Sequence, residues 1–327
     1  MGFFDFLSSK KRVLGVDIGT AGVKIVELEK NENRFKLVNY GLSEMPEGGV
    51  NGLKFSEWPA AKTAEVIKRV LEKMETKNRL AMVSLPIALS FSVLIEMPLL
   101  PESEWPTAIP EEAKKYIPVP IKEVALDWMI VGQSQAKPKD PMIKQDNRSE
   151  TKRMWVVLVA VPNEVIEKYK EIIRLAGLRL KAFEIESFSM ARALILNDPK
   201  SYLILDFGTQ STNAIIVENG SVLAANTIES VKKDGVLPEL ERVVNLHKTR
   251  YNKVITGWVM TGGSVYPPEG AREKKEKEFA PLVKSGLGLE TSFGNPLSRL
   301  EYPETLEDIL KELAPALSVA VGMGMRE

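Results

Sequence analysis

The feature that most constrains the fold is a stretch near the start of the chain, residues 13–28, which reads VLGVDIGTAGVKIVEL. Apolar residues alternate up to Asp17, a turn of small residues follows, and a second alternating run begins at Val23. Alternation on both sides of a short turn predicts a β-hairpin. Asp17 therefore lies where the first strand enters a tight turn.

A second stretch, residues 202–217, repeats this pattern and reads YLILDFGTQSTNAIIV. Asp206 takes the place of the first acid, and Gly208 and Thr209 begin the turn that follows it. Repeats so far apart along the chain do not belong to a solenoid. They predict two similar domains that face each other across a cleft.

The repeated turn suits a phosphate, because glycine lets the backbone come close and successive N–H groups can surround an anion. Mg²⁺ is usually held through one or two carboxylates together with substrate phosphates. We therefore predict a Mg-nucleotide cleft in which Asp17 and Asp206 share the metal. The alternative is that each acid merely ends a tight hairpin.

The composition argues against several other kinds of functional site. The 327 residues carry 44 basic and 44 acidic side chains, so no positive excess indicates a nucleic-acid partner. The absence of cysteine excludes disulfides, thiolate metal sites and a cysteine nucleophile. One histidine, His247, argues against a histidine metal cluster or a Ser-His-Asp triad, and we expect it on the surface of a helix.

The pattern of apolar residues predicts no transmembrane segment and no secretory signal, so we expect a cytoplasmic protein. Residues 1–12, MGFFDFLSSKKR, combine aromatic and basic side chains that could touch an anionic membrane surface. The alternative for this segment is a frayed tail, or a tail docked on its own domain.

The order of the predicted elements argues against a dinucleotide fold. The opening hairpin is followed by a strand at 34–42, an amphipathic helix at 60–77 and a strand at 80–85. This order differs from strict strand–helix alternation, and neither a Gly-x-Gly-x-x-Gly nor a Gly-x4-Gly-Lys motif occurs.

Residues 88–177 have the character of an inserted module. We expect strands at 91–97, 124–131 and 154–161, helices at 105–116 and 163–176, and a loop at 132–153. Within the module, residues 111–124 read EEAKKYIPVPIKEV and are followed by Asp127. This text resembles the PilM family of type IV pilus assembly proteins, in which a Glu-rich helix ends in a Tyr-Ile-Pro-x-Pro turn before a Val-x-x-Asp strand.

The resemblance extends over nearly the whole chain. Its further pieces are the Asp-Ile-Gly start, the helix end at 176–178, the strand and helix at 180–194, the second Asp-x-Gly, and the segments 262–263, 295–297 and 314–322. It implies an α/β fold of the actin-like ATPase, ribonuclease H-like class, similar to FtsA, with two domains, an inserted subdomain and a reduced lid.

The domain boundaries follow from the same resemblance. The first domain would comprise residues 1–87, 178–200 and the closing helix 305–327, with the insert at 88–177. The second domain would comprise residues 201–304, with a lid at 231–253 in which a single helix at 238–248 is expected.

The family pattern also implies which residues bind ATP and Mg²⁺. These are Asp17, Gly19, Thr20 and Lys24 in the first turn, Asp206, Gly208 and Thr209 in the second, and Gly262 and Gly263 near the adenosine. A lysine among apolar neighbours is costly without an anionic partner, and a phosphate would be one. The alternative is that Lys24 points to solvent.

As its partner, the resemblance implies PilN, an inner-membrane protein whose cytoplasmic N-terminal peptide would bind between the first domain and the insert. The protein would then lie at the cytoplasmic face of the inner membrane, among other pilus assembly proteins. A homo-oligomer or a ring is a further expectation. Candidate peptide contacts are Tyr116, Ile117, Val119 and Leu126, which could instead form the core of the insert.

Three functions follow as hypotheses. The first is a scaffold that binds MgATP and hydrolyses it slowly or not at all, since the lid is short. The second is a small-molecule kinase of the same fold, which would need an acid near the cleft and a large closing domain. The third is a structural adaptor, resembling the cytoplasmic part of GspL, that binds no nucleotide.

Overall fold

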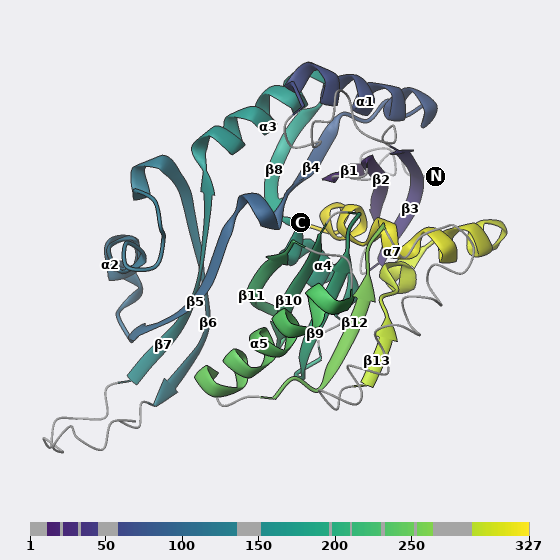
Figure 1. Cartoon of the computed structure of the whole chain (residues 1–327). Helices are drawn as coiled ribbons and strands as arrows, with labels where there is room; N and C mark the ends of the chain where they lie inside the picture. Colours follow the sequence, from purple (N-terminus) through teal and green to yellow (C-terminus); the bar gives the residue numbers. More distant parts are fainter. Residues whose placement is uncertain are drawn as a thin grey trace, which may run out of the picture. The chain divides into compact units, whose positions relative to one another are not determined.

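The computed structural model describes residues 12–19, 22–31, 34–44, 58–135, 152–195, 198–209, 211–229, 233–251, 254–263 and 290–326 (Figure 1). The chain divides into two compact units, one made of residues 1–88 and 167–327 and the other of residues 89–166. The amino-terminal segment before Arg12, with its aromatic and basic residues, lies outside the described residues.

The first sheet of the larger unit grows from the predicted hairpin. Strands β1 (Arg12–Gly19) and β2 (Gly22–Asn31) pair antiparallel, and β3 (Arg34–Glu44) pairs with β2. On the other side, β4 (Leu80–Leu85) and β8 (Arg179–Ile185) run parallel to β1, and β14 (Leu300–Glu301) borders β3. The strand order is β14-β3-β2-β1-β4-β8.

The second sheet repeats this arrangement. Its strands are β9 (Ser201–Phe207), β10 (Thr212–Glu218), β11 (Ser221–Ile228), β12 (Gly257–Thr261) and β13 (Glu290–Phe293), in the order β11-β10-β9-β12-β13. The order β3-β2-β1-β4 in the first sheet corresponds to β11-β10-β9-β12 here. Both predicted hairpins are confirmed, and the sequence repeat is a repeat of topology.

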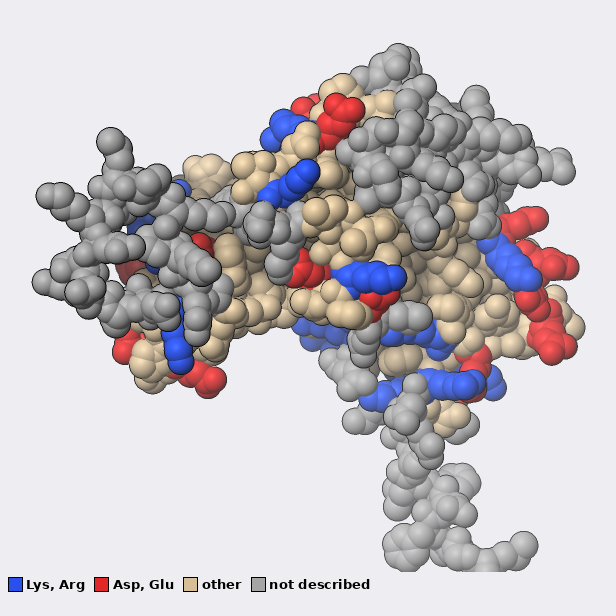
Figure 2. Space-filling model, turned by 90° about the horizontal axis from the view of Figure 1, so that it is seen from below, with Lys and Arg blue, Asp and Glu red and all other residues tan. Residues whose placement is uncertain are grey.

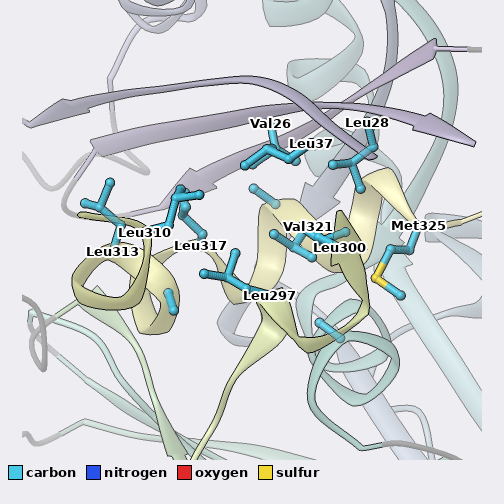
Figure 3. Packing of buried hydrophobic residues seen from close by; sticks show 13 residues of the cluster. Val26, Leu28, Leu37, Leu297, Leu300, Leu310, Leu313, Leu317, Val321 and Met325 are labelled. Carbon is cyan, nitrogen blue, oxygen red and sulfur yellow. The ribbon is translucent and has the colours of Figure 1, made fainter. Parts of the chain in front are cut away.

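Two helices lie between the sheets, α4 (Glu186–Leu194) and α7 (Glu307–Gly324), as Figure 1 shows. Helix α7 contacts α4, strands β1 and β2 of the first sheet, and β12 of the second. On α7, Leu310, Leu313, Leu317 and Val321 pack against Val26, Leu28 and Leu37 of the first sheet (Figure 3). The apolar side chains of this helix therefore form its buried face, except that Ile309 is exposed.

The remaining helices of the larger unit cover the sheets. Helix α1 (Ala60–Lys73) packs on β2 and β3, and α5 (Lys233–Tyr251) packs on β10 and β11. Helix α5 is longer than predicted because its apolar face continues on both sides of Pro238. The expectation of a surface histidine is wrong, because His247 is 2% exposed and lies on the same helix face as Val236, Leu240 and Val243.

The smaller unit is a three-stranded antiparallel sheet with one helix on its apolar face. Strands β5 (Phe91–Pro98), β7 (Lys152–Pro162) and β6 (Val124–Gln135) lie in the order β5-β7-β6, and α2 (Trp105–Ala113) packs on them. Helix α3 (Asn163–Leu175) follows. Helix α2 ends three residues earlier than predicted, since residues 114–116 form a turn.

Two further features concern the charge of the surface and the apolar character of the helices. On the face drawn in Figure 2, positive and negative side chains both occur on the described surface, with uncharged areas between them. Among the described helices, none combines the length and the apolar character that crossing a bilayer requires.

Candidate nucleotide-binding site

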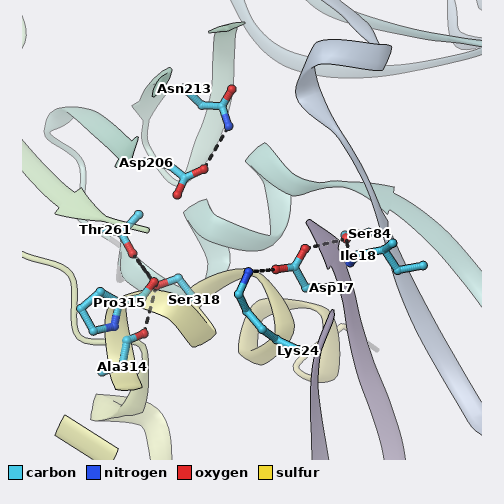
Figure 4. A network of polar contacts seen from close by, with 10 residues as sticks. All are labelled: Asp17, Ile18, Lys24, Ser84, Asp206, Asn213, Thr261, Ala314, Pro315 and Ser318. Carbon is cyan, nitrogen blue, oxygen red and sulfur yellow. Dashed lines mark hydrogen bonds and ion pairs between the residues drawn. The ribbon is translucent and has the colours of Figure 1, made fainter. Parts of the chain in front are cut away.

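The first acid of the repeat is held by three elements. Asp17, at the end of β1, is 3% exposed and accepts hydrogen bonds from Lys24 Nζ at 3.0 Å and from Ser84 Oγ at 3.1 Å (Figure 4). Lys24 belongs to β2 and stands directly opposite Asp17 in the strand register, whereas Ser84 belongs to β4. The alternative in which Lys24 points to solvent is wrong, because its side chain is 15% exposed and pairs with the acid.

The charge of Lys24 is stabilised by more than one carboxylate. Burial alone would lower the pKa of Lys24, but the negative charges of Asp17, Asp206 and Glu186 outweigh this effect and raise the pKa above its usual value. The negative charges of the acids of both repeats thus act on this ammonium group.

The second acid has a neutral partner. Asp206, at the end of β9, accepts a hydrogen bond at 3.0 Å from Nδ2 of Asn213 (Figure 4). The Oδ1 of Asn213 in turn accepts one at 2.8 Å from Thr227 Oγ1. Burial raises the pKa of Asp206, and the Asn213 hydrogen bond and the charge of Lys24 counteract part of that rise.

The first of the two glycines after β12, Gly262, lies against this second acid. Gly262 has φ of +110°, and a Cβ there would lie 2.4 Å from the Phe207 carbonyl oxygen and 2.6 Å from Asp206 Oδ1. No other residue type fits this close approach. The N–H of Gly262 donates to the carbonyl of Pro315 on α7 at 3.1 Å, which fastens the turn to that helix. Around Gly263 no described atom would contact an added Cβ.

The turn residues themselves are partly described. A Cβ at Gly19 would lie 3.3 Å from Lys24 Nζ, and the N–H of Gly208 donates to the Ser211 carbonyl at 2.9 Å. Thr209 is exposed at the tip of the second turn, whereas Thr20 lies outside the described residues.

The prediction from sequence missed a third carboxylate, Glu186. It lies in the first turn of α4, is 9% exposed, and its Oε2 accepts a hydrogen bond from the Ile87 N–H at 3.3 Å. Burial, followed by the charges of Asp17 and Asp206, raises the pKa of Glu186 well above its usual value. The available signal was an acid placed directly between a strand and a helix.

Glu186→Gln is expected to stabilise the protein at neutral pH. A carboxyl whose folded-state pKa is raised contributes fully to stability below its unfolded pKa and loses that contribution as the pH rises through the folded value. The neutral amide avoids this loss, so the free energy of unfolding should rise by about 1 kcal/mol at pH 7.5. Urea unfolding followed by circular dichroism measures it.

At about pH 3 the difference between Glu186→Gln and the wild type should nearly disappear, because the wild-type carboxyl is then mostly protonated in both the folded and the unfolded state. Glu72→Gln, at an exposed position on α1, is the matched control and should change stability at neither pH. A Glu186→Gln protein less stable than the wild type at pH 7.5 would contradict this interpretation.

The donor set fits Mg²⁺ held mainly through water and phosphate. Among the described residues, no group of three or more His, Asp or Glu side chains lies close enough to form a metal cage. Asp17 and Asp206 supply one carboxylate each, which is the protein share that Mg²⁺ normally takes when a nucleotide provides the rest. When bound, the ion would neutralise phosphate charge.

The four candidate peptide contacts lie in different environments. Ile117 is 6% exposed and belongs to the core of the smaller unit, and Tyr116 and Leu126 pack partly buried against that core. Val119 is 43% exposed. Of the four, Val119 therefore offers apolar surface to a partner most directly.

Two sheets of equal strand order, with helices α4 and α7 between them and an acid-ended hairpin in each, define the actin-like ATPase fold. The family model described as type IV pilus assembly protein PilM matches residues 15–227. The chain belongs to this family.

Comparison with solved structures finds one strong similarity and two weaker ones. The structure titled PilM-PilN type IV pilus biogenesis complex is similar with a TM-score of 0.75 and 22% identity, covering 97% of this chain and 98% of that one. The ethanolamine utilization protein EutJ of Carboxydothermus hydrogenoformans has a TM-score of 0.48 at 14% identity, covering 96% of this chain and 89% of that one. The cytoplasmic domain of EpsL of Vibrio cholerae has a TM-score of 0.47 at 10% identity, covering 79% of this chain and 84% of that one.

Proposed function

We propose that this protein is a nucleotide-responsive adaptor of type IV pilus assembly. It binds MgATP between the two sheets of its larger unit and binds the cytoplasmic N-terminal peptide of a PilN-like inner-membrane protein. The observation that carries the proposal is the hydrogen bond between Lys24 and Asp17, together with the effect of the Asp206 charge on the same partly buried ammonium group. Each of the two acids ends one copy of the repeated hairpin.

In this proposal the phosphates lie against the two turns. The backbone at Gly19 and Gly208 approaches them, Lys24 supplies the positive charge, and Thr20 and Thr209 add hydroxyl donors. The adenosine lies along Gly262 and Gly263, where the space around Gly263 is open among the described atoms.

Hydrolysis is expected to be slow. In the segment proposed as a lid, residues 231–253, the described helix α5 packs on β10 and β11 of its own sheet. Enzymes that close a lid over the substrate exclude water from the reaction, and this closure supports fast turnover. Here the nucleotide would act mainly as a conformational ligand.

The partner is proposed from the similar structure, whose title names a PilM-PilN complex. A PilN-like partner would hold this protein at the cytoplasmic face of the inner membrane, next to other pilus assembly proteins. The test is fluorescence anisotropy of a labelled peptide with the sequence of the cytoplasmic N-terminus of the cognate PilN-like protein. Saturable binding whose affinity changes with MgATP supports the adaptor, and absence of binding in both conditions contradicts it.

Val119→Asp should weaken peptide binding at least tenfold while changing the free energy of unfolding by less than about 0.5 kcal/mol, because the side chain is exposed. The charge would replace apolar surface proposed to face the peptide. Anisotropy titration and urea unfolding of the same sample measure both effects. The matched control is Leu246→Asp, at an exposed leucine of α5, which should leave peptide affinity unchanged. Equal peptide affinities of the wild type and Val119→Asp would remove Val119 from the proposed contact.

A further inference from the structure

The two hairpins repeat one hydrogen-bonded pair as well as one topology. In each hairpin the acid stands directly opposite the residue seven positions later, so that Asp17 faces Lys24 and Asp206 faces Asn213. Both partners donate a hydrogen bond of 3.0 Å to the acid. The repeated pair is an acid and a donor, and the two copies differ in the charge of the donor.

Because of this difference, the two hydrogen-bonded pairs differ in net charge. Lys24 compensates the charge of Asp17 within its own pair, whereas the amide of Asn213 adds no charge to the pair that contains Asp206. A cation arriving with a nucleotide is therefore attracted chiefly to the second pair. An anionic phosphate is attracted chiefly to the first, where the ammonium group lies.

The orientation of Asn213 is fixed by its neighbours. A carboxylate only accepts hydrogen bonds, so the amide nitrogen must face Asp206, and the amide oxygen then receives the Thr227 hydroxyl at 2.8 Å. Thr227 is on β11, Asn213 on β10 and Asp206 on β9, so the relay crosses three adjacent strands. The relay holds Oδ2 of Asp206, while Oδ1 lies over the backbone of Gly262.

We propose that Asn213 is a positioning residue that, with Thr227, holds Asp206 in a fixed orientation without placing a cation in its pair. The second hairpin then carries the interaction with nucleotide-bound Mg²⁺, while the first carries the phosphates. This inference rests on the proposed function, because it concerns the metal that accompanies the nucleotide. According to this inference, Mg²⁺ strengthens ATP binding mainly through the Asp206 pair, rather than through both acids equally.

The experiment measures how much Mg²⁺ strengthens ATP binding, as the ratio of the ATP dissociation constants in EDTA and in excess Mg²⁺. Isothermal titration calorimetry of the full chain gives both constants. Asn213→Lys makes the second pair resemble the first and should lower this ratio at least tenfold, with metal-free ATP bound as tightly as by the wild type or more tightly. Thr227→Val, which releases the amide, should lower the ratio by a smaller factor of about three.

The matched control is Asn226→Lys, which adds the same charge at an exposed position of β11 next to Thr227. It should leave the Mg²⁺ ratio at the wild-type value. Urea unfolding of each variant shows whether it is folded, and Thr227→Val, which adds no charge, tests the relay if Asn213→Lys does not fold.

Two outcomes would overturn the inference alone, namely a wild-type ratio in both Asn213→Lys and Thr227→Val, or an equal fall in Asn226→Lys. A wild-type protein that binds no ATP in either buffer would instead overturn the proposed function, and this inference with it. A reduced ratio confined to the Asn213 and Thr227 variants supports the inference.

Discussion

Replacing Gly322 by alanine is expected to destabilise the protein by more than about 3 kcal/mol or to prevent folding. An added Cβ would lie 1.9 Å from the carbonyl oxygen of Ser189 on α4, and a backbone atom cannot move aside as a flexible side chain can. The two helices that lie between the sheets would have to separate. The free energy of unfolding in urea, followed by far-ultraviolet circular dichroism, measures the effect.

Two further glycine substitutions serve as comparisons for Gly322→Ala. Gly15→Ala should be comparably severe, because its Cβ would lie 2.0 Å from the carbonyl of Ala320 on the other side of α7. Gly132→Ala, whose Cβ would have only Trp155 Cδ1 nearby at 3.9 Å, should change stability by less than about 1 kcal/mol. A Gly322→Ala protein as stable as Gly132→Ala would show that the α4–α7 contact is looser than described.

Lys24→Met is expected to destabilise the ligand-free protein by about 3 kcal/mol, because it leaves Asp17 buried with no cation to compensate its charge. The nearby carboxylates of Asp206 and Glu186 lose the same positive neighbour. The loss should become smaller as the pH falls, because the pKa values of Asp206 and Glu186 are raised and their protonation removes negative charge around the substituted position. Urea unfolding at pH 7.5 and at about pH 5 measures both effects.

The control for this prediction is Lys311→Met, which removes an exposed lysine paired with Glu307 on α7. Exposed pairs of this kind contribute well under 1 kcal/mol, so stability should hardly change. If Lys24→Met cost no more than Lys311→Met at pH 7.5, the ammonium group would not be the charge that compensates the acids.

The sequence was sufficient for the parts of the fold that have local signals. Alternation and a small-residue turn marked both hairpins, and the recurrence of Asp17 as Asp206 indicated the duplication before any contact was known. These features depend on residues close together in the chain, where strand and helix periods can be read directly.

The parts that the sequence did not predict depend on residues distant in the chain. Glu186 joins the site because α4 starts beside Ile87, 99 positions earlier in the chain. Asn213 follows from the seven-residue spacing shared with Lys24, which becomes meaningful only when the strand register is known. Polarity alone suggested an exposed His247, but its place on the apolar face of α5 decides its burial.

The most direct test of the central proposal, one nucleotide site built from both hairpins, is calorimetric titration of MgATP into the wild type, Asp17→Asn and Asp206→Asn. We expect a single site with a dissociation constant in the micromolar range for the wild type, weakened at least a hundredfold in Asp206→Asn and by a smaller factor in Asp17→Asn, which keeps the Lys24 cation but removes the acid that positions it. No binding by the wild type, or binding that either substitution leaves intact, would contradict a site shared by the two repeats.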